Sequence, residues 1–208
     1  MIKAVLFDVD GVLLDSFEAN LDFYQSLMKR AGYLGPTREQ YAERFHMPMK
    51  EFIGKIAPFA SAEEVHRIWE MGRAQNDLYN QTLLALTEGT ETIIPLLSAR
   101  YPLGIVTSRV LVGVYERTPL KNFESHFATV VSYEDTENHK PHPDPLLLAA
   151  QRLSCTPDTC VYIGDQETDM IAARAAGMKG VHFTTMTPTF GDAHIMSLSD
   201  ILTTIEGF

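Results

Sequence analysis

Short apolar runs rich in Val and Ile recur along the chain, and longer amphipathic stretches separate them. The runs do not alternate between apolar and polar residues, which is typical of strands buried on both faces of a parallel sheet. The intervening stretches carry helix signals, such as Asp144 and Pro145 at the start of one and Gly177 at the end of another. This alternation predicts an α/β fold with a Rossmann-like, doubly wound parallel sheet. We expect its strands at residues 2–7, 103–106, 128–131, 161–163 and 180–183, and helices at 145–153 and 168–176.

One connection is too long for a simple crossover between two strands. Residues 16–87 contain no strand-like run and instead show apolar residues at helical spacing. The helix signals are the stripe Phe17, Leu21, Tyr24 and Met28 and the capping boxes Thr37 with Gln40 and Ser61 with Glu64. We therefore predict a core made of residues 1–15 and 88–208, with residues 16–87 inserted as an α-helical cap.

The net charge of the chain disfavours two classes of binding partner. The chain has 17 Lys and Arg against 27 Asp and Glu, a net charge of -10, so it repels a phosphate backbone and an anionic membrane surface. We expect no nucleic-acid partner and no membrane association. The two cysteines cannot form a disulfide framework, and the apolar run before Asp8 is too short for a secretion signal. These features favour a cytoplasmic location.

Polar side chains follow four of the predicted strands, and the carboxyl ends of parallel strands meet at one edge of a sheet. In chain order these residues are Asp8 and Asp10, then Thr107, Ser108 and Arg109, then Lys140, and finally Asp165 and Asp169. Carboxylates that converge at close range are costly unless a cation lies among them, and an oxygen-only ligand set suits Mg²⁺. Lys140, the Thr107 hydroxyl and the backbone N–H groups near Gly11 and Ser108 would hold phosphoryl oxygens. The sequence therefore predicts phosphoryl transfer.

These residues form four motifs that resemble the haloacid dehalogenase superfamily of phosphohydrolases, in the subgroup whose helical cap follows the first motif. The motifs cover nearly the whole chain. They are Asp-x-Asp-Gly-Val-Leu-Leu-Asp-Ser at 8–16, Thr107 in Ile-Val-Thr-Ser, Lys140 in Lys-Pro-x-Pro-x-Pro, and Gly164-Asp165 with Asp169.

The resemblance implies a role for each residue. Asp8 would be the nucleophile that forms an aspartyl-phosphate, and Asp10 the general acid and base. Thr107 and Lys140 would bind the transferring phosphoryl group. Asp8, the Asp10 carbonyl and Asp165 would hold Mg²⁺, with Asp169 as a ligand or beside the ligands. A general acid must hold a proton, so we also expect a raised pKa at Asp10 and an ionised Asp8.

Sequence details favour one activity within the superfamily. Asp10 is present, which disfavours dehalogenases and phosphonoacetaldehyde hydrolases. Asn20 stands where sugar phosphomutases of the β-phosphoglucomutase type commonly carry His, and the Gly-Asp form of the fourth motif is similar to phosphoglycolate phosphatases and pyrophosphatases. We expect a phosphatase. The alternatives are a sugar phosphomutase and, in another class, a catalytically weak phosphate-binding or signalling module.

The cap is expected to set specificity for a small phosphorylated metabolite. The loop at residues 46–51 is similar to the substrate loop of capped relatives, and Lys50 or Arg44 could reach an anionic substrate. A solvated helix charge explains either residue equally well. Arg109 stands where relatives often carry Lys, which favours a role beside the phosphate. The physiological substrate stays open, as does the choice between monomer and homodimer.

Overall fold

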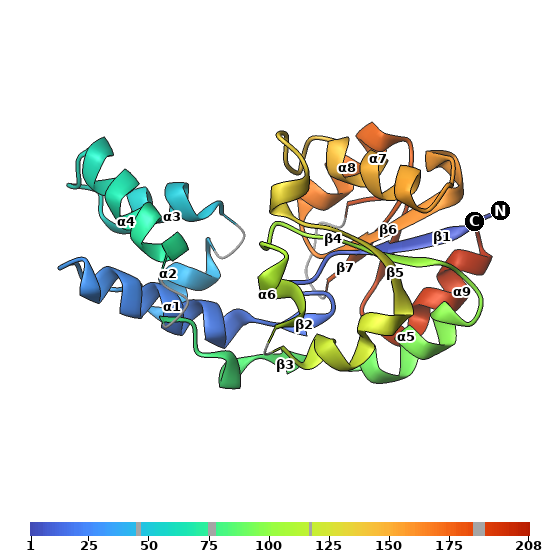
Figure 1. Ribbon diagram of the computed structural model, residues 1–208, viewed down its shortest axis with the longest axis horizontal. Helices are drawn as coiled ribbons and strands as arrows, with labels where there is room; N and C mark the ends of the chain where they lie inside the picture. The colour runs from blue at the N-terminus through green and yellow to red at the C-terminus, as the bar shows by residue number, and fades with distance from the viewer. Residues whose placement is uncertain (45–46, 75–77, 117, 185–189) are drawn as a thin grey trace. The chain divides into compact units, whose positions relative to one another are not determined.

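The computed structural model describes residues 1–44, 47–74, 78–116, 118–184 and 190–208, and it divides into two compact units (Figure 1). One unit is Met1–Asp15 with Ala85–Phe208, and the other is Ser16–Leu84. The second unit ends before the expected residue 87, because β3 (Ala85–Leu86) pairs antiparallel with β2 (Leu14–Asp15) in the first unit. A bond from the Thr87 N–H to the Leu13 carbonyl continues this pairing.

The first unit contains a six-stranded sheet in the order β5-β4-β1-β6-β7-β8, and every pairing in it is parallel. The strands are β1 (Ala4–Phe7), β4 (Leu103–Val106), β5 (Phe127–Val131), β6 (Cys160–Gly164), β7 (Lys179–Phe183) and β8 (Ala193–Ile195). The predicted α/β class is confirmed, and all five predicted runs form strands. The edge strand β8 was missed because three residues with an exposed histidine in the middle give no apolar run.

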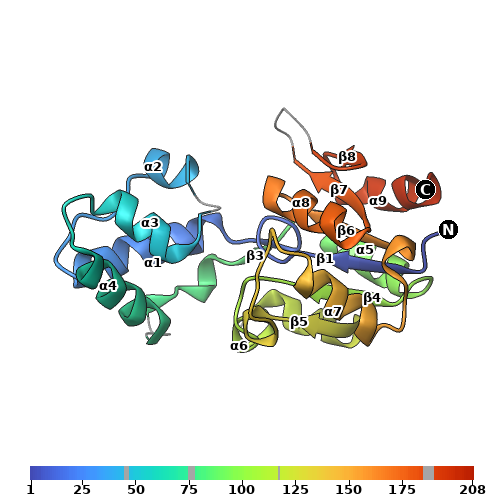
Figure 2. The same cartoon turned by 90° about the horizontal axis from the view of Figure 1, so that it is seen from above.

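Helices cover both faces of this sheet, with one layer above it and one below it in Figure 1, and Figure 2 looks down on the upper layer. Val5 and Phe7 of β1 point to the face covered by α5 (Thr90–Ser98) and α9 (Ile201–Glu206). Ala4 and Leu6 point to the opposite face, covered by α7 (Asp144–Arg152) and α8 (Glu167–Ala176). Because successive residues of a strand face opposite sides, a run with no polar position is what two covered faces require.

The helices that support the site begin and end close to the predicted positions. Pro143 occupies the N-cap of α7, so Asp144 is the first helical residue rather than the cap. Gly177 ends α8 in the left-handed conformation, with φ 74°, as expected for a C-cap glycine. The short helix α6 (Val112–Tyr115) and the 3₁₀ segment at Pro119–His126 complete the connection between β4 and β5.

The second unit is helical and has its own core. It contains α1 (Phe17–Arg30), α2 (Arg38–Ala42), α3 (Met49–Ile56), α4 (Ala62–Ala74) and a 3₁₀ turn at Gln81–Leu83. Both predicted capping boxes form, with the reciprocal bonds of Thr37 with Gln40 and of Ser61 with Glu64. The buried residues of this hydrophobic core are Leu21, Phe23, Tyr24, Leu27, Met28, Tyr41, Phe52, Ile53, Ala57 and Ile68. Across the described parts of the chain, we find no helix with the length and apolar character to span a bilayer.

Phe52 anchors the core of the helical unit, since its side chain is 1% exposed and its ring lies 4.3 Å from that of Tyr24. We expect Phe52→Ala to lower the free energy of unfolding by about 3–5 kcal/mol, because it removes a buried ring and leaves a cavity. The measurement is urea unfolding followed by the fluorescence of Trp69, the single tryptophan, which packs against the same core. The control Glu51→Ala, at an exposed position of the same helix, should stay within about 0.5 kcal/mol. Equal losses in the two variants would contradict this packing.

Candidate active site

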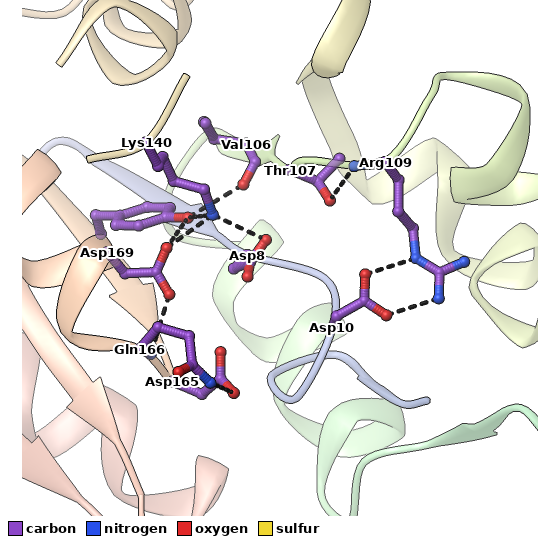
Figure 3. Close-up of polar contacts among 10 residues, drawn as sticks. Asp8, Asp10, Val106, Thr107, Arg109, Lys140, Asp165, Gln166 and Asp169 are labelled. Carbon is purple, nitrogen blue, oxygen red and sulfur yellow. Dashed lines mark hydrogen bonds and ion pairs between the residues drawn. The ribbon is translucent and has the colours of Figure 1, made fainter. Parts of the chain in front are cut away.

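Three carboxylates meet at the carboxyl edge of the sheet. Asp8 follows β1, Asp165 follows β6 and Asp169 lies in the first turn of α8 (Figure 3). Each offers an oxygen, and these oxygens lie within 4.8 Å of one another. The Asp8 N–H donates to the Ile163 carbonyl at 2.9 Å, which extends the β1–β6 pairing into the site and fixes the start of the Asp8 loop.

Lys140 supplies the positive charge of this cluster from the loop between β5 and α7. Its side chain is 7% exposed, and its Nζ lies 3.1 Å from Asp8 Oδ1, 2.7 Å from Asp169 Oδ1 and 2.7 Å from Tyr162 Oη. An ammonium group has three donors, so these three acceptors satisfy it. Burial opposes the charged form, but the attraction of Asp169 and Asp8 outweighs it and raises the pKa of Lys140 above its usual value.

Tyr162 belongs to the same network, and the sequence reasoning missed it. Its Oη accepts from Lys140 and lies 3.1 Å from the Val106 carbonyl and 3.2 Å from Asp169 Oδ1. Burial and the nearby carboxylates raise the pKa of Tyr162 well above its usual value, so the phenol stays neutral. The available signal was a tyrosine inside an otherwise apolar strand, because a fully buried phenol needs polar partners.

The carboxylates are crowded. Burial raises the pKa of Asp8 to about 7 against the opposing attraction of Lys140, and the charges of Asp169 and Asp10 add to the rise. Burial also raises the pKa of Asp165 well above its usual value, with Asp169 and Asp8 adding to it. Burial therefore opposes the ionised form of Asp8, whereas Lys140 favours it, and an ionised Asp8 stays a prediction.

One oxygen of this cluster is suited to bind a cation. Asp165 Oδ2 accepts from Gln166 Nε2 at 2.5 Å, whereas Asp165 Oδ1 is buried and has no hydrogen-bond partner among the described residues. A buried carboxylate oxygen without a partner costs free energy. A hard divalent cation would satisfy this oxygen and relieve the repulsion among the three carboxylates. The residues present thus fit Mg²⁺.

Gly11 is required by the close approach of Asp165. The residue has φ +76°, and a Cβ on it would lie 2.2 Å from Asp165 Oδ2. Its N–H already donates to the Leu14 carbonyl at 2.8 Å. The turn after β1 thus uses the Gly11 donor, and a phosphate role for the other backbone N–H groups near Gly11 stays a prediction.

Asp10 points away from the three carboxylates and toward Arg109 (Figure 3). The Arg109 guanidinium donates two bonds to it, from Nε to Oδ2 at 2.7 Å and from Nη2 to Oδ1 at 2.6 Å. A third bond, from Arg109 Nη1 to the Gly113 carbonyl, fixes the guanidinium. Of the four predicted acidic residues, Asp8, Asp165 and Asp169 therefore bring their carboxylates together, whereas the Asp10 carboxylate is engaged by Arg109. A metal-binding role for the Asp10 carbonyl stays a prediction.

The remaining predicted residues are placed as follows. Thr107 is buried beside the cluster, and its Oγ1 accepts from the Arg109 N–H at 3.2 Å, whereas Ser108 is exposed. In the helical unit, Lys50 Nζ lies 3.4 Å from His66 Nδ1 and 5.4 Å from the centre of the Trp69 ring. Arg44 bonds to Glu43 and to the Gln40 carbonyl. His46, in the expected substrate loop, lies outside the described residues. A substrate role for Lys50 or Arg44 stays a prediction.

The chain is similar to known proteins over most of its length. The sequence pattern of the haloacid dehalogenase-like hydrolase family matches residues 5–183. The chain belongs to this family. Pyrophosphatase PpaX of Bacillus velezensis is 31% identical over 97% of this chain and 95% of its own length. The phosphoglycolate phosphatase of Shigella boydii is 27% identical over 97% of this chain and 88% of its own length.

Solved structures of other haloacid dehalogenase-like hydrolases share the fold. A subfamily IA hydrolase from Geobacter sulfurreducens is 29% identical and superimposes with a TM-score of 0.77, covering 98% of this chain and 96% of that one. The CbbY protein of Rhodobacter sphaeroides, solved in complex with phosphate, has a TM-score of 0.75 at 21% identity, over 97% of this chain and 96% of that one. This second likeness concerns the fold alone.

The raised pKa values predict how stability depends on pH. In the metal-free native protein Asp8 keeps its proton up to about pH 7, whereas its ordinary pKa is 3.8. The native state thus binds more protons than the unfolded state between these values, so stability falls as the pH rises. Asp165→Asn removes one of the crowded charges. Without metal it should raise the free energy of unfolding by roughly 1 kcal/mol or more at pH 8 and change it little at pH 4.

The same variant tests the metal site. Mg²⁺ should raise the melting temperature of the original protein at pH 8 through binding to the native state, and it should leave that of Asp165→Asn nearly unchanged. Thermal unfolding in chelator and in excess Mg²⁺ measures both effects. A metal-free Asp165→Asn protein that is less stable than the original at pH 8 would contradict the crowding of these carboxylates.

Proposed function

We propose that the protein is a Mg²⁺-dependent phosphatase that hydrolyses a small phosphorylated metabolite through an aspartyl-phosphate on Asp8. The class is that of its relatives: the chain is a phosphoric monoester hydrolase of the haloacid dehalogenase-like family. The observation that carries the finer proposal is the position of Asp8. Its carboxylate contacts the buried ammonium of Lys140 and has an oxygen within 4.8 Å of oxygens of Asp165 and Asp169, so that a phosphoryl group would meet a nucleophile and neutralising charge together.

In the first half of the reaction, an Asp8 oxygen attacks phosphorus and the bond to the leaving oxygen breaks. The leaving oxygen takes a proton from Asp10. Lys140 and the Thr107 hydroxyl hold the equatorial phosphoryl oxygens. Lys140 bonds to Asp8 in the resting structure, so it can shift a donor to the phosphoryl group without leaving its place.

In the second half, water attacks the phosphorus of the aspartyl-phosphate and gives a proton to Asp10, which restores the acid. The Asp8–phosphorus bond breaks and inorganic phosphate leaves. Mg²⁺, held by Asp8, Asp165 and the Asp10 carbonyl with Asp169 beside them, would neutralise the carboxylates and favour the ionised nucleophile. For proton transfer, Asp10 has to release at least one of its two bonds to Arg109.

Asp8→Asn is the direct test of the nucleophile. Hydrolysis of p-nitrophenyl phosphate by the original protein should require Mg²⁺ and stop in chelator. The variant should lose at least about a thousandfold in kcat, since an amide oxygen is a poor nucleophile. The control Asp158→Asn changes an exposed residue that precedes β6 at the other edge of the sheet, and it should retain full activity. Comparable activity in Asp8→Asn would contradict the proposal.

The same preparation separates the phosphatase from the mutase. With a panel of sugar phosphates, phosphoglycolate and pyrophosphate, a phosphatase releases inorganic phosphate in proportion to the substrate consumed. A mutase yields isomerised sugar phosphate instead. We expect phosphate release without isomerisation.

Arg109 is proposed to act on Asp10 and beside the phosphate. Arg109→Gln removes the charge and the two-bond fork, and we expect kcat/KM for p-nitrophenyl phosphate to fall about tenfold. Arg109→Lys keeps the charge but not the planar fork, so it should recover only part of the loss. Steady-state kinetics of the three proteins checks this, and unchanged kcat/KM in both variants would show that the Arg109–Asp10 pair has no part in turnover.

A further inference from the structure

His182 is a buried histidine beside the cluster, and none of the roles described above uses it. It lies on β7 opposite Gly164 of β6 and is 4% exposed. Its Nδ1 accepts from the Phe190 N–H at 3.1 Å, and its Nε2 lies 3.1 Å from the Asp165 carbonyl oxygen. Because a backbone N–H occupies Nδ1, the ring proton is on Nε2, which therefore donates to Asp165.

The bond from His182 to the Asp165 carbonyl lies where the hydrogen bonding between β6 and β7 ends. The β6–β7 pairing ends at Gly164 and His182, so the Asp165 carbonyl lies just past the end of the pairing. The His182 side chain provides the donor there that another strand residue would have provided. A buried imidazole costs free energy unless both nitrogens are bonded, and here both bonds are made to backbone atoms.

The carbonyl that His182 bonds belongs to Asp165, and the side-chain carboxylate of that residue is closely surrounded. Gly11 lies against Oδ2, Gln166 donates to Oδ2, and Oδ1 is buried without a partner among the described residues. One oxygen of this carboxylate lies within 4.8 Å of oxygens of Asp8 and Asp169. Rotation of the Asp165 peptide would move that oxygen away from Asp8 and Asp169. The bond from His182 opposes this rotation from the side of β7.

We propose that His182 is a positioning residue of the cation site: its Nε2–H fixes the Asp165 peptide, so that the carboxylate faces Asp8 and Asp169 and binds a divalent cation tightly. The inference rests on the cation site of the proposed function. It does not depend on which phosphorylated substrate the enzyme uses.

Two substitutions of His182, to Gln and to Asn, each keep one of its two hydrogen bonds. Glutamine carries its amide N–H near the position of Nε2 and can still donate to the Asp165 carbonyl. Asparagine reaches only the position of Nδ1 and can keep the Phe190 bond, but not the Asp165 bond. A positioning role therefore predicts rescue by Gln and none by Asn, whereas a role in packing alone does not separate the two.

The test is binding of Mn²⁺, used as a spectroscopic probe in place of Mg²⁺, to the full chain by electron paramagnetic resonance without substrate. We expect His182→Asn to raise the Kd for Mn²⁺ about tenfold or more, as for loss of a hydrogen bond that orients a ligand. His182→Gln should stay within about threefold of the original. Ile195→Ala changes a buried residue of the neighbouring edge strand β8. It is the control for general loss of stability and should leave the Kd unchanged.

The outcomes separate this inference from the proposed function. Equal Kd values for Mn²⁺ in His182→Asn and His182→Gln would overturn the role of His182. A Kd that also rises in Ile195→Ala, in proportion to its lower melting temperature, would overturn it as well. A parallel assay of the original protein with p-nitrophenyl phosphate tests the function alone. If the original protein does not hydrolyse p-nitrophenyl phosphate, but His182→Asn weakens Mn²⁺ binding and His182→Gln does not, the inference stands and the phosphatase proposal falls. If the original protein binds no Mn²⁺, the inference falls.

Discussion

The ammonium group of Lys140 is buried among Asp8, Asp169 and Tyr162, and the arrangement of the site depends on this charge. A single buried cation cannot neutralise three neighbouring carboxylates. Burial raises the pKa values of Asp8 and Asp165, and the neighbouring carboxylates raise them further. Because the three carboxylates carry more negative charge than Lys140 can neutralise, the site attracts a divalent cation. With that cation bound, it can accept the negative charge of a phosphate ester. The acidic net charge of the chain is thus compatible with an anionic substrate.

The parallel sheet explains how residues so distant in sequence form one cluster. Asp8 and Asp165 follow adjacent strands, β1 and β6, and Thr107 follows β4 on the other side of β1. All three strands end at the same edge. The helical unit is inserted directly after the first of these strand ends, where added residues leave the pairing of the sheet unchanged.

Much of this could be predicted because it depends on short stretches of sequence. The buried strands, the glycine that ends α8 and the capping boxes of the helical unit are set by local patterns, and the strand ends place Asp8, Thr107, Lys140 and Asp165. The pairing of Asp10 with Arg109 could not be predicted in the same way, because it joins residues 99 positions apart whose charges have other candidate partners.

The missed features share this cause. Tyr162 and His182 each occupy a strand position for which the sequence pattern predicts only a buried residue. Their polar atoms bond to groups at the ends of other strands. The sequence predicts that Gly11 lies at the site, but it does not show why a glycine is needed there. The reason is the close approach of Asp165, which follows another strand. Tertiary contacts of this kind are visible only once the sheet order is known.

The covalent intermediate on Asp8 tests the account most directly. The protein is mixed with Mg²⁺ and p-nitrophenyl phosphate, quenched in acid during turnover and treated with borohydride, which reduces an acyl phosphate but not a free carboxylate. Mass spectrometry of the digested protein should then find homoserine in place of Asp8, and Asp10 unchanged. Sustained turnover with Asp8 unmodified at every quench time, or reduction at another carboxylate, would contradict the account.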